Sequence, residues 1–199
     1  MILAMTTKEK ILKQALILFS EHGYEGVSVA MIAERCSIKA PSLYKHFKSK
    51  KEIFEEVYNH SCKKLDAVIS QIALKESEEK NISEEILFQK QKEIVNLLIH
   101  DDEIKRLRCL MKLSNDSQIK AMYSKRFFDQ IINYHAALFS SLIEKKIMIN
   151  ESPSALALLY DSPIIVVLDE LDRHPEREEE LLNRLYEHCK LFIKLVTKT

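Results

Sequence analysis

The chain has 199 residues, of which 46% are hydrophobic and 30% are charged. This apolar share can fill a packed core, and only 2 Gly and 4 Pro leave few places for tight turns, so the composition favours long helices over short strands. Lysine and arginine together number 30, as do aspartate and glutamate, which excludes a basic field over the whole molecule. A site for a polyanion must therefore be local.

The four cysteines are far apart and show neither a CxxC pair nor the Cys/His spacing of a zinc site. We therefore expect no metal, no cofactor and no disulfide framework, and a cytoplasmic location. The apolar start is too short for a signal peptide, and no later run reaches the roughly 18 residues of a membrane span. The helical pattern begins after Met5, so the sequence leaves open whether Met1 or Met5 is the initiator.

Two helices are predicted before residue 37. The first follows a capping site at Thr6, carries an apolar stripe over residues 11–19, and ends at Gly23. Ser28 is the predicted N-cap of a short second helix, which ends near Cys36.

A third short helix is indicated by Pro41, a residue that suits a first helical turn. We expect Ser42, Tyr44, Lys45 and His46 on its polar side, and Leu43 and Phe47 on its anchoring side. Ser49 then caps a longer fourth helix with a continuous inner apolar face.

The remainder of the chain predicts further helices. Residues 75–80 are charged and poor in apolar side chains, so we expect a loop there, ahead of Ser83. Beyond it, apolar spacing predicts helices over residues 83–100, 103–113, 118–146, 154–171 and 176–197. Strand-like alternation is absent, so the expected fold is all-α with about nine helices.

A strongly basic segment is hidden in the neutral chain. Residues 35–51 contain no acid and six cations: Arg35, Lys39, Lys45, Lys48, Lys50 and Lys51. A short helix that is pinned at its back and polar at its front can enter the major groove of DNA. The alternative is a solvated charged turn, but the position between two capped helices favours the DNA-reading interpretation.

A family resemblance is carried by residues 11–57, which read ILKQALILFSEHGYEGVSVAMIAERCSIKAPSLYKHFKSKKEIFEEV. This stretch resembles the DNA-binding head of the TetR/AcrR family of bacterial regulators. The hallmarks are Ala15, Phe19, Gly23-Tyr24, Ile32-Ala33, Leu43-Tyr44, Phe47 and Ser49-Lys50-Lys51-Glu52. The resemblance implies a three-helix helix-turn-helix domain at residues 6–50 and a helical dimerisation and effector-binding domain at residues 51–199.

The resemblance also implies which residues touch double-stranded DNA. Ser28 with the start of the second helix, Tyr44 and Lys50 would contact phosphates, and the third helix would lie against base edges, with Lys45 donating to guanine. The implied set is Ser28, Val29, Lys39, Ala40, Pro41, Ser42, Tyr44, Lys45, His46 and Lys50. Two departures from the family pattern are Ser37, where most relatives have Gly, and Lys39, where most have a capping Ser.

The last two helices are the expected homodimer interface, because residues 155–168 and the stripe over residues 181–196 carry much apolar surface. The resemblance implies a four-helix bundle built from these helices of two subunits. Ordinary core packing is the alternative. A two-fold dimer would place its reading helices about 34 Å apart or somewhat more, facing a near-palindromic operator.

The middle helices are where the resemblance implies a cavity for a small-molecule effector. Its candidate lining is Leu107, Met111, Phe127, Phe128, Ile131, Tyr134, His135, Phe139 and Tyr160. Plain core is the alternative for each of these residues. Pro163, inside an apolar helix, would open backbone hydrogen bonding near this site.

The function implied is a sequence-specific transcriptional repressor that a small-molecule inducer releases from its operator. One alternative is an activator or regulator controlled by a protein partner, without a small-molecule pocket. A second is a helical enzyme or lipid carrier with a relic DNA-binding head. We expect no enzyme: the cluster at residues 100–103 (HDDE) reads as an acidic helix start, and no catalytic triad pattern, phosphate loop or HExxH motif is present.

Overall fold

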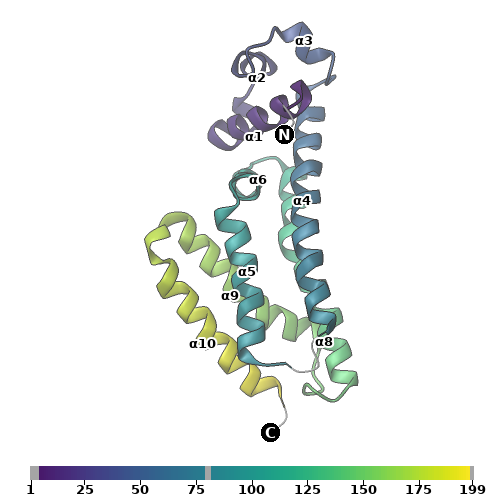
Figure 1. The fold of residues 1–199 in the computed structure, drawn as a ribbon, viewed down its shortest axis with the longest axis vertical. Helices are drawn as coiled ribbons and strands as arrows, with labels where there is room; N and C mark the ends of the chain where they lie inside the picture. Colours follow the sequence, from purple (N-terminus) through teal and green to yellow (C-terminus); the bar gives the residue numbers. More distant parts are fainter. Residues whose placement is uncertain (1–4, 79–81, 198–199) are drawn as a thin grey trace. The chain divides into compact units, whose positions relative to one another are not determined.

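The computed structural model describes residues 5–78 and 82–197, and nearly all of them are helical (Figure 1). The helices are α1 Thr7–Gly26, α2 Val29–Arg35, α3 Ala40–Tyr44, α4 Lys50–Glu78, α5 Glu84–His100, α6 Asp102–Leu113, α7 Ser117–Ser124, α8 Gln130–Glu144, α9 Pro153–Arg173 and α10 Glu178–Val196. A π-helical turn, Lys125–Asp129, joins α7 to α8, so these three form one segment. Counted in this way, the described residues form nine helices, which confirms the all-α prediction.

The chain divides into two compact units. The first comprises residues 1–69 and 102–120, and the second comprises residues 70–101 and 121–199. The first unit therefore holds α1 to α3, the whole of α6 and the larger part of α4, up to Ile69. The second unit holds α5, α8, α9 and α10. Across residues 5–78 and 82–197 no helix combines the length and apolar character that crossing a membrane requires.

The helix starts of the first unit follow the predicted caps. The Thr6 hydroxyl accepts from the Glu9 backbone N–H at 3.2 Å, and the Glu9 carboxylate accepts from the Thr6 backbone N–H at 2.8 Å. Ser28 accepts from the Met31 N–H at 3.2 Å. Gly23, at φ 72°, kinks α1, but the helix continues to Gly26, so the predicted end at Gly23 is wrong by three residues.

The core of the first unit is formed by the apolar faces of α1 to α4. Phe19 contacts the rings of Tyr24 and Phe54, with centroids 5.5 and 6.1 Å away. On the α6 side, Glu103 accepts a hydrogen bond from the Ser61 hydroxyl of α4 at 2.7 Å. Arg106 donates to the Ser20 hydroxyl of α1 at 3.1 Å. Helix α6 is thus tied to both α1 and α4.

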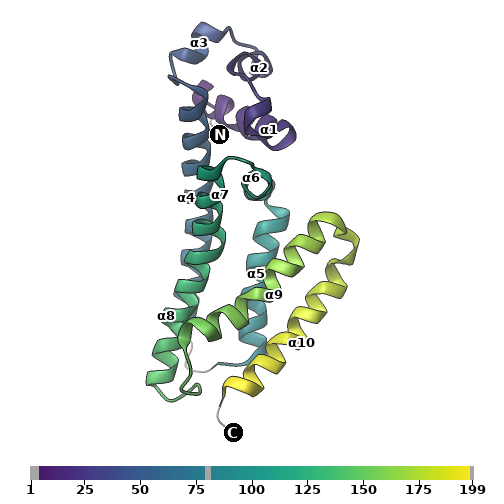
Figure 2. The ribbon, with the colours of Figure 1, turned by 180° about the vertical axis from the view of Figure 1, so that it is seen from behind.

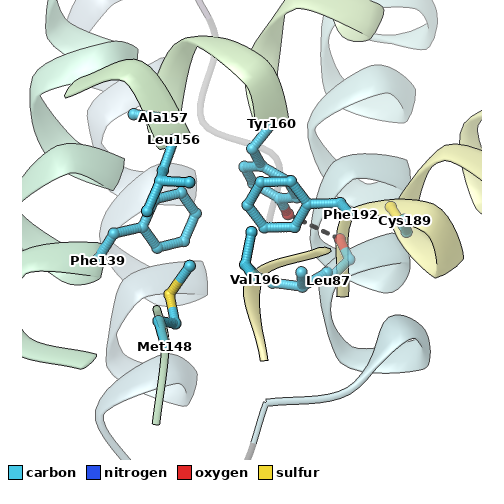
Figure 3. Packing of buried hydrophobic residues seen from close by; sticks show 9 residues of the cluster. All are labelled: Leu87, Phe139, Met148, Leu156, Ala157, Tyr160, Cys189, Phe192 and Val196. Carbon is cyan, nitrogen blue, oxygen red and sulfur yellow. Dashed lines mark hydrogen bonds between the residues drawn. The ribbon is translucent and has the colours of Figure 1, made fainter. Parts of the chain in front are cut away.

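In the second unit, α9 crosses α5 and packs against α8 and α10 (Figure 2). The centre of this packing is the cluster shown in Figure 3, which is formed by Leu87, Phe139, Met148, Leu156, Ala157, Tyr160, Cys189, Phe192 and Val196. Its aromatic rings interlock, because Tyr160 lies 5.7 Å from Phe139 and 5.3 Å from Phe192 between ring centroids. The cluster therefore joins helices α5, α8, α9 and α10 into one core.

The end of α4 differs from the prediction. Helix α4 continues to Glu78, so the loop expected over residues 75–80 is wrong for residues 75–78; the rest of that expected loop up to Lys80 lies outside the described residues. Lysine and glutamate are good helix formers even where no apolar stripe requires a helix. Weak amphipathicity therefore did not end this helix.

Ser37 occupies the turn between α2 and α3 with a left-handed backbone, at φ 58°. A side chain costs about 1–2 kcal/mol in that conformation, whereas glycine adopts it freely but loses more entropy on folding. We predict that Ser37→Gly raises the free energy of unfolding by about 0.5–1 kcal/mol, measured by urea denaturation. Ser37→Ala keeps Cβ and is the control; an equal gain in both variants would contradict a backbone origin.

Candidate nucleic-acid interface

Helix α3 is only five residues long and is held from behind. Leu43 and Phe47 are buried, with 0% and 2% of their surface exposed. At its start, Lys39 occupies the N-cap position without a side-chain cap, and a proline lies in the first turn. The departure at Lys39 therefore removes a capping bond, and Pro41 presets the backbone in its place.

The predicted extent of this helix is wrong at its end. Ser42 and Tyr44 lie on α3, but Lys45 is its C-cap and His46 lies in the turn that follows. The right-handed winding nevertheless continues, since the N–H groups of His46 and Phe47 both donate to the Leu43 carbonyl, at 2.9 and 3.1 Å. Leu43 and Phe47 are four residues apart, so this winding keeps both on the buried side.

The polar side of α3 and its following turn faces outward from the first unit. Tyr44 is 54% exposed, and Lys45 and His46 are also exposed. Ser28, Lys39 and Pro41 are exposed, whereas Val29, Ala40 and Ser42 are partly buried. Within residues 5–78 and 82–197, neither Lys39 nor Lys45 forms an ion pair. Their charges are available to an external anion.

Lys50 differs from the other cations because its amine is held within the protein. Its Nζ donates to the Tyr24 carbonyl at 2.9 Å and lies 4.3 Å from the centroid of the Tyr24 ring. Glu25 is a third neighbour, at 3.8 Å. A lysine ammonium has three N–H donors, so a phosphate can still receive one. Lys50 therefore both fastens α4 to the end of α1 and remains a phosphate ligand candidate.

The start of α4 is capped as the sequence predicts. The Ser49 hydroxyl accepts from the Glu52 N–H at 3.1 Å, and the Glu52 carboxylate accepts from the Lys48 backbone N–H. These two bonds satisfy backbone donors that the first helical turn leaves free. The basic turn at residues 45–50 is thereby fixed between two helices.

The proposed effector residues fall into two groups. Leu107 and Met111 are fully buried in the first unit, whereas the other seven belong to the second. There, four of them are brought together around His135. Between ring centroids, His135 lies 5.0 Å from Tyr134, 6.0 Å from Phe139 and 4.9 Å from Tyr160. Of the remaining candidates, Phe127 is buried, Ile131 is partly buried and Phe128 is 40% exposed.

An acid that sequence reasoning missed lies beside this aromatic group. His135 Nδ1 and Asp161 Oδ2 are 2.8 Å apart, and Asp161 is only 3% exposed. The other oxygen, Oδ1, is buried and has no hydrogen-bond partner among the described residues. Burial raises the pKa of the Asp161 carboxyl, and the hydrogen bond and charge of His135 oppose that rise. The available signal in the sequence is that Asp161 is the single acid of the apolar stretch over residues 155–168.

The exposed basic turn, its two buried anchors and the capped helices on either side define a helix-turn-helix DNA-binding protein. Residues 11–57 match the family model described as bacterial regulatory proteins, tetR family. The biofilm operon icaADBC negative transcriptional regulator IcaR of Staphylococcus aureus strain Newman is 33% identical over 158 residues, which span 77% of this chain and 79% of IcaR. The chain belongs to the tetR family of bacterial regulators.

Solved structures agree with the fold. A regulator described as a putative TetR-family protein from Mesorhizobium loti superposes with a TM-score of 0.76 at 22% identity, covering 96% of this chain and 97% of the other. FadR of Bacillus subtilis, in complex with stearoyl-CoA, gives a TM-score of 0.68 at 15% identity, with 92% and 96% covered. Both support the all-α architecture described above.

The buried acid gives a prediction on pH. Because burial raises the folded-state pKa of Asp161, its ionisation opposes folding: the favourable contribution is complete below the ordinary carboxyl pKa and is lost as pH rises through the raised value. The stability of the wild type relative to Asp161→Asn should therefore fall as pH rises from acid to neutral, measured by urea unfolding. Exposed Asp129→Asn is the control. A difference that is constant or grows with pH would contradict this sign.

Proposed function

We propose that this chain is a homodimeric, cytoplasmic repressor that binds a near-palindromic operator and is released by a small-molecule effector. The observation that carries the DNA-binding part is the outward-facing polar edge of α3, braced by Leu43 and Phe47. The repressor part draws on similarity to IcaR, which is described as a negative regulator. The protein acts by binding and not by catalysis.

The division of labour at the DNA follows from side-chain chemistry. Lys45 is exposed and unpaired by any acid of the described residues, and it reads a guanine edge. Tyr44 and Lys39 reach phosphates beside it. Ser28 accepts a helix N–H through its hydroxyl oxygen and keeps its own proton to donate to a phosphate. The phosphate contacts fix the register in which Lys45 meets the bases.

The dimer forms through α9 and α10. Six large apolar side chains of these helices are 44–68% exposed, and we call them the apolar stripe: Leu158, Leu159, Ile165, Val166, Leu191 and Leu195. An apolar surface of this kind is costly in water and is the usual mark of a protein interface. A second copy of the same chain offers a matching stripe under two-fold symmetry.

The effector binds in the second unit, next to the aromatic group around His135. Rings supply apolar contact, and the His135–Asp161 pair supplies a polar anchor, so an amphipathic small molecule fits this chemistry. The FadR neighbour was solved with an acyl-CoA, which supports ligand binding by this fold. Release of DNA requires that the effector bind one state of the dimer more tightly than the other. Helix α4, shared by both units, carries the change to the DNA-binding head.

Selection of bound sequences from a random DNA pool tests the proposal most directly. We expect enrichment of a near-palindrome whose half-sites are separated by about one helical turn, ~10 base pairs, or somewhat more. The recovered sequence then serves as the probe for every later measurement. A pool that remains unenriched at low salt would refute sequence-specific binding.

Variants of α3 and its neighbours separate base reading from phosphate binding. Lys45→Ala should cost about 1–3 kcal/mol on the selected operator and little on random DNA, so that base preference relaxes. Tyr44→Phe combined with Lys50→Ala should weaken binding to both DNAs. It should also reduce the slope of log affinity against log salt by about 1 for each phosphate that the variant no longer binds.

Fluorescence anisotropy across a salt series measures both effects. Exposed Lys125→Ala, which removes a charge from the second unit, is the matched control and should change neither affinity nor slope. If Lys45→Ala weakens operator and random DNA equally, Lys45 binds phosphate and its assignment to base reading is wrong.

A further inference from the structure

Pro163 interrupts the hydrogen bonding of α9 without ending the helix. Proline has no N–H, so the carbonyl of Leu159, four residues earlier, loses its donor from the helix itself. The helix nevertheless continues from Pro153 to Arg173. We call residues 159–163 the proline break. A break of this kind is a weak point in a helix unless other groups hold it.

A buried side chain of α5, itself bonded to α10, reaches this break. Gln91 of α5 is 1% exposed, and its Nε2 donates to the Tyr160 carbonyl at 2.7 Å. Its Oε1 accepts from the Cys189 thiol of α10 at 3.2 Å. The Tyr160 carbonyl of the break is thus bonded to α5, and the same Gln91 amide is bonded to α10.

The Tyr160 side chain adds a bond in the opposite direction. Its hydroxyl donates to the Leu87 carbonyl of α5 at 2.9 Å, which Figure 3 shows as a dashed line. Backbone and side chain of Tyr160 are therefore both fastened to α5, through Gln91 and Leu87. Since an unpaired buried amide is costly, these bonds hold the break at a fixed position against α5.

The α9 part of the apolar stripe lies on both sides of this break. Leu158 and Leu159 come before Pro163, and Ile165 and Val166 follow it. Leu158 and Ile165, like Leu159 and Val166, are seven residues or about two helical turns apart, so the two pairs form one surface only while the helix keeps a set geometry between them. What holds the break also aligns the two pairs.

We infer that Gln91 is a positioning residue for dimerisation, which holds the proline break of α9 in the one geometry whose apolar stripe a second copy can cover. Gln91 is buried, so it acts through the residues of α9 and α10 to which it is bonded. This inference rests on the proposed dimer, and it adds a control point that is remote from the interface itself.

The test is a double-mutant cycle on the full chain, with the dimer dissociation constant measured by sedimentation equilibrium. Gln91→Met keeps the length of the side chain but cannot donate, and should raise the dissociation constant about tenfold. Pro163→Ala removes the ring that kinks the helix at this point, so the helix itself holds the geometry, and in that background Gln91→Met should change the constant less than about twofold.

Val95→Ala is the matched control, because Val95 is a buried α5 residue one turn from Gln91 and lacks a polar group. It should have the same effect in both backgrounds. An equal effect of Gln91→Met with and without Pro163, or no effect in either, would overturn the inference. If Gln91→Met alone fails to fold, the double variant should recover fold and dimer, and its failure to do so also overturns it. A monomeric wild type would instead refute the proposed dimer.

Discussion

The burial of Leu43 and Phe47 is the constraint on which the DNA-binding surface depends. A helix of five residues is far below the roughly 12–15 residues that an isolated helix needs in water, so α3 exists only because these two side chains are packed into the core. Their inward direction forces Tyr44, Lys45 and His46 outward. The chemistry offered to DNA is therefore set by apolar residues that never touch it.

Local signals made most of the fold predictable. The caps at Thr6, Ser28 and Ser49 each act within three or four residues, and all three are found where the sequence predicts them, whereas Gly23 kinks α1 without ending it. The end of α3 at Tyr44 was missed because no local stop signal marks it. The same limit applies to Lys50, whose partner Tyr24 is 26 residues away.

The candidate site in the second unit was predictable only in part. Aromatic residues on the inner stripe of α8 indicated His135 and Phe139, but the carboxylate partner of His135 is 26 residues away on α9. Gln91 and Tyr160 are 69 residues apart, and no pattern in one chain pairs them. Lone polar residues in apolar helices flag such sites, yet only the packing of helices identifies their partners.

Helices α3 and α9 differ in which side chains they bury and which they expose. In α3, apolar side chains are buried so that polar groups can face a polyanion, whereas α9 buries Asp161 and exposes Leu158 and Val166. An inverted arrangement of this kind is unfavourable twice, through a desolvated carboxylate and through wetted apolar surface. Covering the outer face recovers the hydrophobic free energy. The buried carboxylate of Asp161 already has His135 as its hydrogen-bond partner. The dimer that we propose through α9 and α10 would supply this cover.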